Sequence, residues 1–261
     1  MTVFVEPGRD DRAAVDKAIS LLLAFGAQAS TGLGVSELAR RAQMSKSTAF
    51  RLLGALERTG VVERVGAGYR LGARLHTLGN SVYAPGHDRA RDLLLPYVAE
   101  LYELTRETVH LAVLHGTDVV YLAKLYGHRA PASPSRIGGR LPAHYTAVGK
   151  VLLAHDPDAA AITLSGPLPQ ATPKSIGRPE ALAAELERIR TEGLAYDDEE
   201  SRLGLACVAA PVFAPGGRVV AALSVSGPVS RVDLQRAARE LRRVSFAATQ
   251  ATARARLSRT A

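Results

Sequence analysis

The chain has 261 residues, of which 47% are hydrophobic, and its 33 basic and 25 acidic side chains give a net charge of +8 at pH 7. The length allows two domains with separate cores, and the apolar fraction argues against a disordered chain. Cys207 is the only cysteine, which excludes an intrachain disulfide and argues against a cysteine-based zinc site.

The N-terminal residues lack the charged and apolar layout of a signal peptide. No apolar run approaches the roughly 18 residues that span a bilayer. We therefore expect a cytoplasmic protein without a membrane partner. The sequence contains no motif for a cofactor or a metal, so neither is expected.

Residues 35–60 predict two short helices joined by a tight turn. Ser36 is the candidate N-cap of the first helix, whose apolar positions are Val35, Leu38, Ala39 and Ala42. Ser45 is the candidate N-cap of the second helix, which runs to about Thr59 and ends at Gly60. The predicted buried face of this second helix consists of Ala49, Phe50, Leu52, Leu53 and Leu56.

A hairpin follows these helices, because two apolar runs flank Gly66-Ala67-Gly68. Two helices and a hairpin in this order are the parts of a winged helix-turn-helix, which places its second helix in the major groove of DNA. Ser47, Thr48 and Arg51 are expected to reach base edges, and Ser45 and Lys46 to hold phosphates. The hairpin residues expected to assist are Arg64 and Arg70.

The charge distribution permits DNA binding without requiring it. Residues 1–85 carry 11 basic and 7 acidic side chains, a net charge of +4, whereas residues 86–230 have a net charge of −2. Arginine makes up 28 of the 33 basic residues, a bias that GC-rich coding also produces. The alternative at this point is a generic helical pair whose basic residues are merely solvated.

The chain beyond residue 72 predicts an α+β domain. We divide the protein into a winged helix-turn-helix domain (1–72), a linker helix and hinge (73–88) and a second domain (89–261). Helices are expected at 89–107, where Pro96 marks a kink or a boundary, at 148–155 and at 178–192. Strands are expected at 108–114, 119–125, 194–196, 207–213 and 219–226. The basic end, 231–259, is predicted to be a long helix with a solvated face.

Three segments of the chain resemble the IclR family of bacterial transcriptional regulators. They are the helix-turn-helix at 35–60, the loop and helix start at 139–154, and the segment 193–213 with the strand 221–228. Finding all three in order is far more specific than finding one, and the resemblance spans residues 12–250. It implies a winged helix-turn-helix followed by a GAF-like α+β domain that binds a small effector, often an organic acid or an aromatic catabolite.

Carried over from the family, the effector site consists of Ala147, Val148, Asp197, Cys207, Ser224 and Ser226. The residue types agree, because residues 147–150 open a predicted helix whose free N–H groups favour a carboxylate. Ser224 and Ser226 share one face of a strand. Asp197 is an unusual partner for an anion, so it must accept a ligand hydroxyl, bind protonated, or hold the surrounding donors in place. In the alternatives, Cys207 is a buried filler and the two serines face solvent.

The resemblance predicts a regulator that binds a palindromic operator in double-stranded DNA as a homodimer, or as a tetramer, under control of a small effector, for which a carboxylate is favoured. We favour repression over activation. One alternative is an architectural DNA-binding protein without a ligand. Another is an enzyme with Cys207 as nucleophile and His144 or His110 as base, but no catalytic motif supports it. For His144 we expect a structural hydrogen bond.

Overall fold

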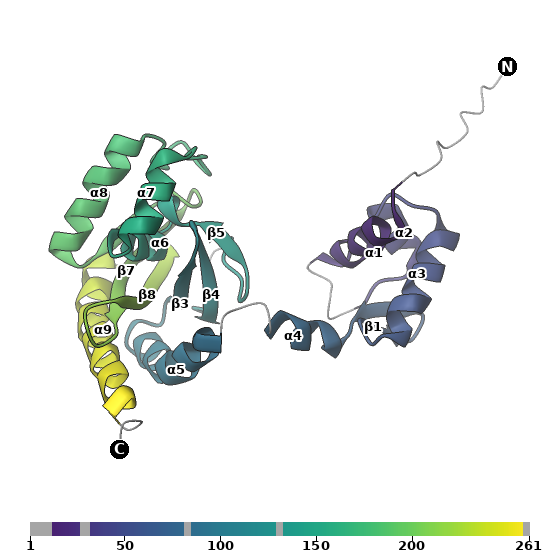
Figure 1. Cartoon of the computed structure of the whole chain (residues 1–261), viewed down its shortest axis with the longest axis horizontal. Coiled ribbons are helices and arrows are strands. Elements are labelled where there is room, and N and C mark those ends of the chain that lie inside the picture. The colour runs from purple at the N-terminus through teal and green to yellow at the C-terminus, as the bar shows by residue number, and fades with distance from the viewer. Residues whose placement is uncertain (1–11, 27–31, 81–84, 129–132, 258–261) are drawn as a thin grey trace. The chain divides into compact units, whose positions relative to one another are not determined.

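The computed structural model describes residues 12–26, 32–80, 85–128 and 133–257 (Figure 1). Its backbone contacts divide the chain into two units, residues 1–83 and 84–261, and the division falls within the predicted linker. No helix in the described ranges is long and apolar enough to cross a membrane.

The first unit is a winged helix-turn-helix, as predicted. It contains α1 (Ala14–Leu23), α2 (Val35–Arg41), α3 (Lys46–Arg58), the strands β1 (Val62–Val65) and β2 (Gly68–Leu71), and α4 (Ala73–Asn80). The two strands pair as an antiparallel hairpin whose turn begins at Gly66, a residue with φ +58° that glycine adopts without strain. The sequence patterns above do not single out α1.

The core of this unit is built around fully buried side chains of α1, α2 and α3, including Leu21, Leu38 and Leu53. Two local predictions are wrong. The N-cap of α2 is Gly34, without a side-chain cap, because the helix begins one residue before Ser36. Phe50 is 56% exposed, because α3 turns its buried face along Ala49 and Leu53.

The second unit is the predicted α+β domain. Its helices are α5 (Pro85–Thr105), α6 (Ala147–Ala154), α7 (Pro157–Ser165), α8 (Pro179–Glu192) and α9 (Leu234–Leu257). Its strands are β3 (Thr108–His115), β4 (Asp118–Leu125), β5 (Arg140–Pro142), β6 (Ala195–Asp198), β7 (Leu205–Phe213) and β8 (Val219–Pro228). Pro96 lies inside α5 without ending it, and α7 and β5 are elements that the sequence patterns missed.

The six strands form one antiparallel sheet in the order β5-β4-β3-β8-β7-β6. The helix α6 contacts five of these strands and, with α7 and α8, shares an apolar core with one face of the sheet. The helices α5 and α9 pack on each other and against the opposite face of the sheet (Figure 1). The arginines of α9 at positions 236, 239 and 242 are exposed, which confirms the predicted solvated face.

The strand register places polar residues in two rows on the face that α6 covers. In one row Cys207 of β7 is opposite Ser226 of β8, which is opposite Thr108 of β3. In the other row Ser224 is opposite His110, which is opposite Lys124 of β4. Residues directly opposite one another in a sheet share a face. The two rows therefore form one polar strip across the middle of the sheet.

Candidate functional site

The start of α3 gathers three hydroxyl groups at an exposed helix end. The Thr48 N–H donates to Ser45 Oγ at 3.2 Å, so Ser45 is the N-cap, as predicted. Ser45 Oγ also lies 2.9 Å from Thr48 Oγ1 and 3.0 Å from Ser47 Oγ. The N-terminus of a helix carries a partial positive charge, which attracts phosphate.

The basic side chains predicted to contact DNA differ in how far their charge is already offset. Lys46, Arg51 and Arg64 are exposed and form no ion pair with the described residues. Arg70 instead pairs with Glu63 across the hairpin at 2.7 Å, and this contact lowers the pKa of Glu63. Of these four side chains, only Arg70 has its charge offset by a carboxylate of the described residues.

The six residues predicted to bind an effector all line a single cavity between the sheet and the start of α6. The cavity is narrow, with a volume of about 20 Å³, little more than a water molecule needs. The rest of the lining consists of residues that were not predicted to bind an effector: His110, Tyr121, Ser133, Pro134, Ser135, Leu141, Thr146, Ser201 and Leu205.

Three buried polar groups of this cavity have no hydrogen-bond partner in the described part of the chain. Thr146 caps α6 by accepting the Gly149 N–H at 3.1 Å, which leaves the N–H groups of Ala147 and Val148 without an acceptor. The hydroxyl of Ser226, a residue only 2% exposed, is the third. Because buried polar groups are nearly always paired, their convergence points to a ligand.

Asp197 lines the cavity but directs its carboxylate to its own loop. The carboxylate accepts the Glu200 N–H at 2.7 Å, the Ser201 N–H at 3.2 Å and the Ser201 hydroxyl at 2.6 Å. Burial raises the pKa of Asp197, and these donors oppose that rise. Of the three roles that we considered for Asp197, the contacts favour holding the surrounding donors in place.

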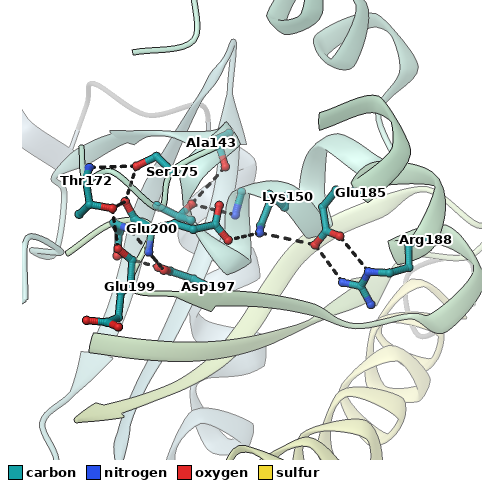
Figure 2. A network of polar contacts seen from close by, with 12 residues as sticks. Ala143, Lys150, Thr172, Ser175, Glu185, Arg188, Asp197, Glu199 and Glu200 are labelled. Atoms are coloured by element: carbon teal, nitrogen blue, oxygen red, sulfur yellow. Dashed lines mark hydrogen bonds and ion pairs between the residues drawn. The ribbon is translucent and has the colours of Figure 1, made fainter. Parts of the chain in front are cut away.

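A buried ionic network joins this loop to the helices above the sheet, as Figure 2 shows. Lys150 of α6 is 1% exposed and pairs with Glu200, and its ammonium lies 3.5 Å from Glu185 of α8. Arg188 donates to both oxygens of Glu185, at 2.8 and 2.9 Å. The hydroxyl of Ser175 donates to the Glu200 carbonyl at 2.6 Å. The segment that carries Asp197 and Ser201 is therefore fastened to α6 and α8.

The groups considered for catalysis are poorly suited to it. Burial raises the pKa of the Cys207 thiol, which is protonated at neutral pH and so a weak nucleophile. Burial, assisted by Lys124, lowers the pKa of His110 to about 3. His144 donates from Nε2 to the Pro169 carbonyl at 2.9 Å, which confirms the structural hydrogen bond expected for it. Within the described ranges no cluster of His, Cys, Asp and Glu is placed to hold a metal ion.

A larger cavity, of about 430 Å³, lies elsewhere in the second unit, between α5, α9 and the ends of β3 and β8. Its lining is mainly apolar, with Arg89, Asp156 and Arg218 among the exceptions. Size alone does not identify a binding site, and ligand orientation requires a few convergent polar groups. The narrow cavity has such groups, buried and unpaired, so it is the better candidate.

The fold and the two sites define a class of protein: a DNA-binding helix-turn-helix unit joined to a sensor unit with a ligand cavity. The family model of the IclR helix-turn-helix domain matches residues 14–66, and that of the bacterial transcriptional regulator IclR C-terminal domain matches residues 88–253. The chain belongs to the IclR family of transcriptional regulators, whose C-terminal domain binds an effector.

Named relatives agree with this assignment. The chain is 35% identical to the transcriptional regulator KdgR of Escherichia coli over 230 residues, covering 85% of this chain and 86% of the relative. It is 31% identical to the transcriptional repressor IclR of the same organism over 220 residues, covering 81% and 78%. These relatives are regulators, not enzymes.

Solved structures support the same architecture. The Thermotoga maritima IclR structure has a TM-score of 0.75 and 29% identity, covering 92% of this chain and 96% of that one. An IclR homologue of Microbacterium hydrocarbonoxydans, solved in complex with 4-hydroxybenzoate, has a TM-score of 0.73 and 29% identity, covering 92% and 99%.

Proposed function

We propose that this protein represses transcription by binding a palindromic operator through α3, and that a small carboxylate in the narrow cavity controls this binding. The observation that carries the proposal is the set of buried, unpaired donors at Ala147, Val148 and Ser226. A carboxylate has two oxygens that accept such donors, and a helix N-terminus favours its charge. Repression is supported by the relatives named repressors, such as IclR of Escherichia coli.

The proposed DNA contacts divide into base readers and phosphate holders. Ser47, Thr48 and Arg51 lie on the first turns of α3, the part of a recognition helix that meets base edges. Lys46 and Ser45 adjoin them and are assigned to phosphates, with Arg64 and Arg70 assisting from the hairpin. Because Arg70 pairs with Glu63, we expect Arg70 to contribute less to DNA affinity than Arg64 does.

Fluorescence anisotropy with the full chain tests these roles, using a selected operator and a random duplex. Arg51→Ala should cost about 1–3 kcal/mol on the operator and little on the random duplex. Lys46→Ala should weaken both duplexes alike and reduce the salt slope by about one. If Arg51→Ala weakens the two duplexes equally, Arg51 does not read a base.

Dimerisation is proposed through α1. Its residues Val15, Ile19 and Leu23 recur at intervals of four and are 71%, 51% and 75% exposed, which makes an apolar stripe along the helix. An exposed apolar stripe of this kind supports an interface at α1. A second copy of the chain would cover the stripe and supply the second recognition helix that a palindromic operator requires. Light scattering of Ile19→Glu should show a shift toward monomer.

The effector proposal is tested by thermal stability against a panel of short aliphatic and aromatic acids, including 4-hydroxybenzoate. A ligand at 100 times its Kd should stabilise the protein by about 2.7 kcal/mol and raise Tm by a few degrees. Ser226→Ala should lose most of the shift, whereas Ser165→Ala, an exposed serine of α7, should keep it. If no acid shifts Tm, the effector is not a carboxylate.

The effector must favour one DNA-binding state of the protein over another to act as a switch. A difference in affinity of about 1–3 kcal/mol between those states gives a useful response. The same anisotropy assay measures it, because a saturating effector should then change the operator Kd by about 5- to 150-fold.

A further inference from the structure

The polar strip on the sheet continues past the six predicted effector residues, toward β4. Ser224 is followed across the sheet by His110 and then by Lys124. A bulge in β4 sets the position of Lys124 on this face, because Ala112 of β3 pairs with Tyr121 while the preceding Leu111 pairs with Ala123. One extra residue therefore brings Tyr121 and Lys124, three positions apart, onto the same face.

Ser135, from the segment before β5, lies over this end of the strip. Its hydroxyl is 2.8 Å from His110 Nε2 and 2.6 Å from Ser133 Oγ. Lys124 donates to the Ser135 carbonyl at 2.9 Å and to its hydroxyl at 3.0 Å. The other imidazole nitrogen, Nδ1, is 3.3 Å from Ser224 Oγ. Ser135 thus connects Lys124 to the lining of the cavity.

Lys124 is a buried cation without a counter-ion. Lys124 is 7% exposed, and its ammonium forms no ion pair with the described residues. Its ammonium lies 4.5 Å from the centre of the Tyr126 ring, and its hydrogen bonds go to neutral oxygens of Ser135. Burial lowers the pKa of Lys124, and the positive charge of Arg136 acts in the same direction.

Lys150, which is also buried in this unit, has the counter-ions that Lys124 lacks in the described part of the chain. Lys150 is balanced by the carboxylates of Glu200 and Glu185. An unbalanced buried charge is costly, and proteins keep such a charge where it meets a charged partner. At Lys124 the described residues supply cations and neutral groups only, so the fitting partner is an anion from outside the chain.

We propose that Lys124 and His110 form a second pole of the effector site, and that the effector is a small diacid. This inference rests on the proposed carboxylate effector. One carboxylate binds the start of α6 and Ser226, and the other replaces the Ser135 oxygens as the acceptor for Lys124. Neutral His110 donates a hydrogen bond to the ligand between the two poles. Displacement of Ser135 also supplies the volume that the narrow cavity lacks.

Calorimetry of the full chain with matched acids tests the inference. The probes are succinate with butyrate and terephthalate with benzoate, each pair differing by one carboxylate. The wild type should bind at least one diacid ten or more times more tightly than its monoacid. Lys124→Met should abolish that preference and leave monoacid affinity within twofold. Ser226→Ala, at the first pole, should weaken both members of the pair.

Three outcomes overturn it in different ways. If the wild type binds monoacids as tightly as diacids and Lys124→Met changes neither, the second pole is wrong and the carboxylate effector stands. If Lys124→Met weakens both members equally, Lys124 only positions Ser135. If no acid binds the wild type, the carboxylate effector itself fails. Lys124→Gln repeats the test, with Tm as the check on folding.

Discussion

The helices α3 and α6 begin in the same way but in opposite surroundings. Ser45 caps α3 by accepting the Thr48 N–H at 3.2 Å, and Thr146 caps α6 by accepting the Gly149 N–H at 3.1 Å. The start of α3 is exposed, whereas every residue of α6 is buried. Water satisfies the remaining N–H groups of α3, but those of α6 need a partner of defined position. A capped helix N-terminus is therefore suited to DNA where it is exposed, as in α3, and to a small anion where it is buried, as in α6.

The glycine in each of these helices offers the sharpest test of this difference. A Cβ at Gly149 would fall inside contact distance of the Ala143 backbone, whereas at Gly54 of α3 it would meet only an Arg58 side-chain atom at 3.9 Å. Gly149→Ala should therefore destabilise the protein by about 3 kcal/mol or more. Gly54→Ala should stabilise it by about 0.5–1 kcal/mol, because alanine is the better helix former.

Denaturant unfolding of the two variants, followed in the unit that each glycine occupies, measures both effects. Opposite signs support the close packing of α6 on the segment 143–145. A neutral Gly149→Ala would show that α6 has room to move, which would contradict the proposal of a preorganised anion site at its start.

Acid should weaken the sensor unit specifically, because His110 is held neutral there. Burial first, and Lys124 second, lower its pKa to about 3, while an unfolded imidazole has a pKa of about 6.5. The unfolded state therefore binds more protons between these values. Stability that is complete above pH 6.5 is lost as the pH falls through this window, by up to about 1.4 kcal/mol per pH unit.

Unfolding of wild type and His110→Gln at pH 7, 6 and 5 checks this. The variant should lose less stability on acidification, and His115→Gln, at an exposed position, should behave as the wild type. Equal pH slopes for wild type and His110→Gln would show that another group controls acid sensitivity. The aromatic neighbour of His110 is Tyr121, whose ring centre is 5.2 Å away and whose pKa burial raises, so it does not titrate in this range.

The smallest expected effect separates the two helix starts functionally. Ser45→Ala and Thr146→Ala should each cost about 1 kcal/mol of stability through loss of the cap. Ser45→Ala should weaken operator binding and leave ligand-induced stabilisation intact. Thr146→Ala should do the reverse. Anisotropy and thermal shift on the same preparations measure both, and a cap variant that impairs both functions equally would contradict the division of roles.

Local patterns were sufficient for most elements of the chain. Apolar periodicity identified α2, periodicity together with the Ser45 cap identified α3, and apolar runs identified the hairpin and five of the six strands of the sheet. They wrongly predicted that Phe50 of α3 is buried, because periodicity does not say which side of a helix its neighbours cover. They also missed β5, which is three residues long and exists only because it pairs with β4.

The motifs of the sequence were enough to assign the class of the protein. The six predicted effector residues came from the family resemblance, and the structure shows that all six line one cavity. Which polar groups meet across the strands depends instead on the pairing of the strands in the folded protein. Lys124 and Lys150 both lie in apolar runs of the sequence. In the fold Lys150 pairs with Glu200, whereas Lys124, which a one-residue bulge brings to the cavity face, has no counter-ion among the described residues. Pairing and burial depend on residues distant along the chain, so no local pattern contains them.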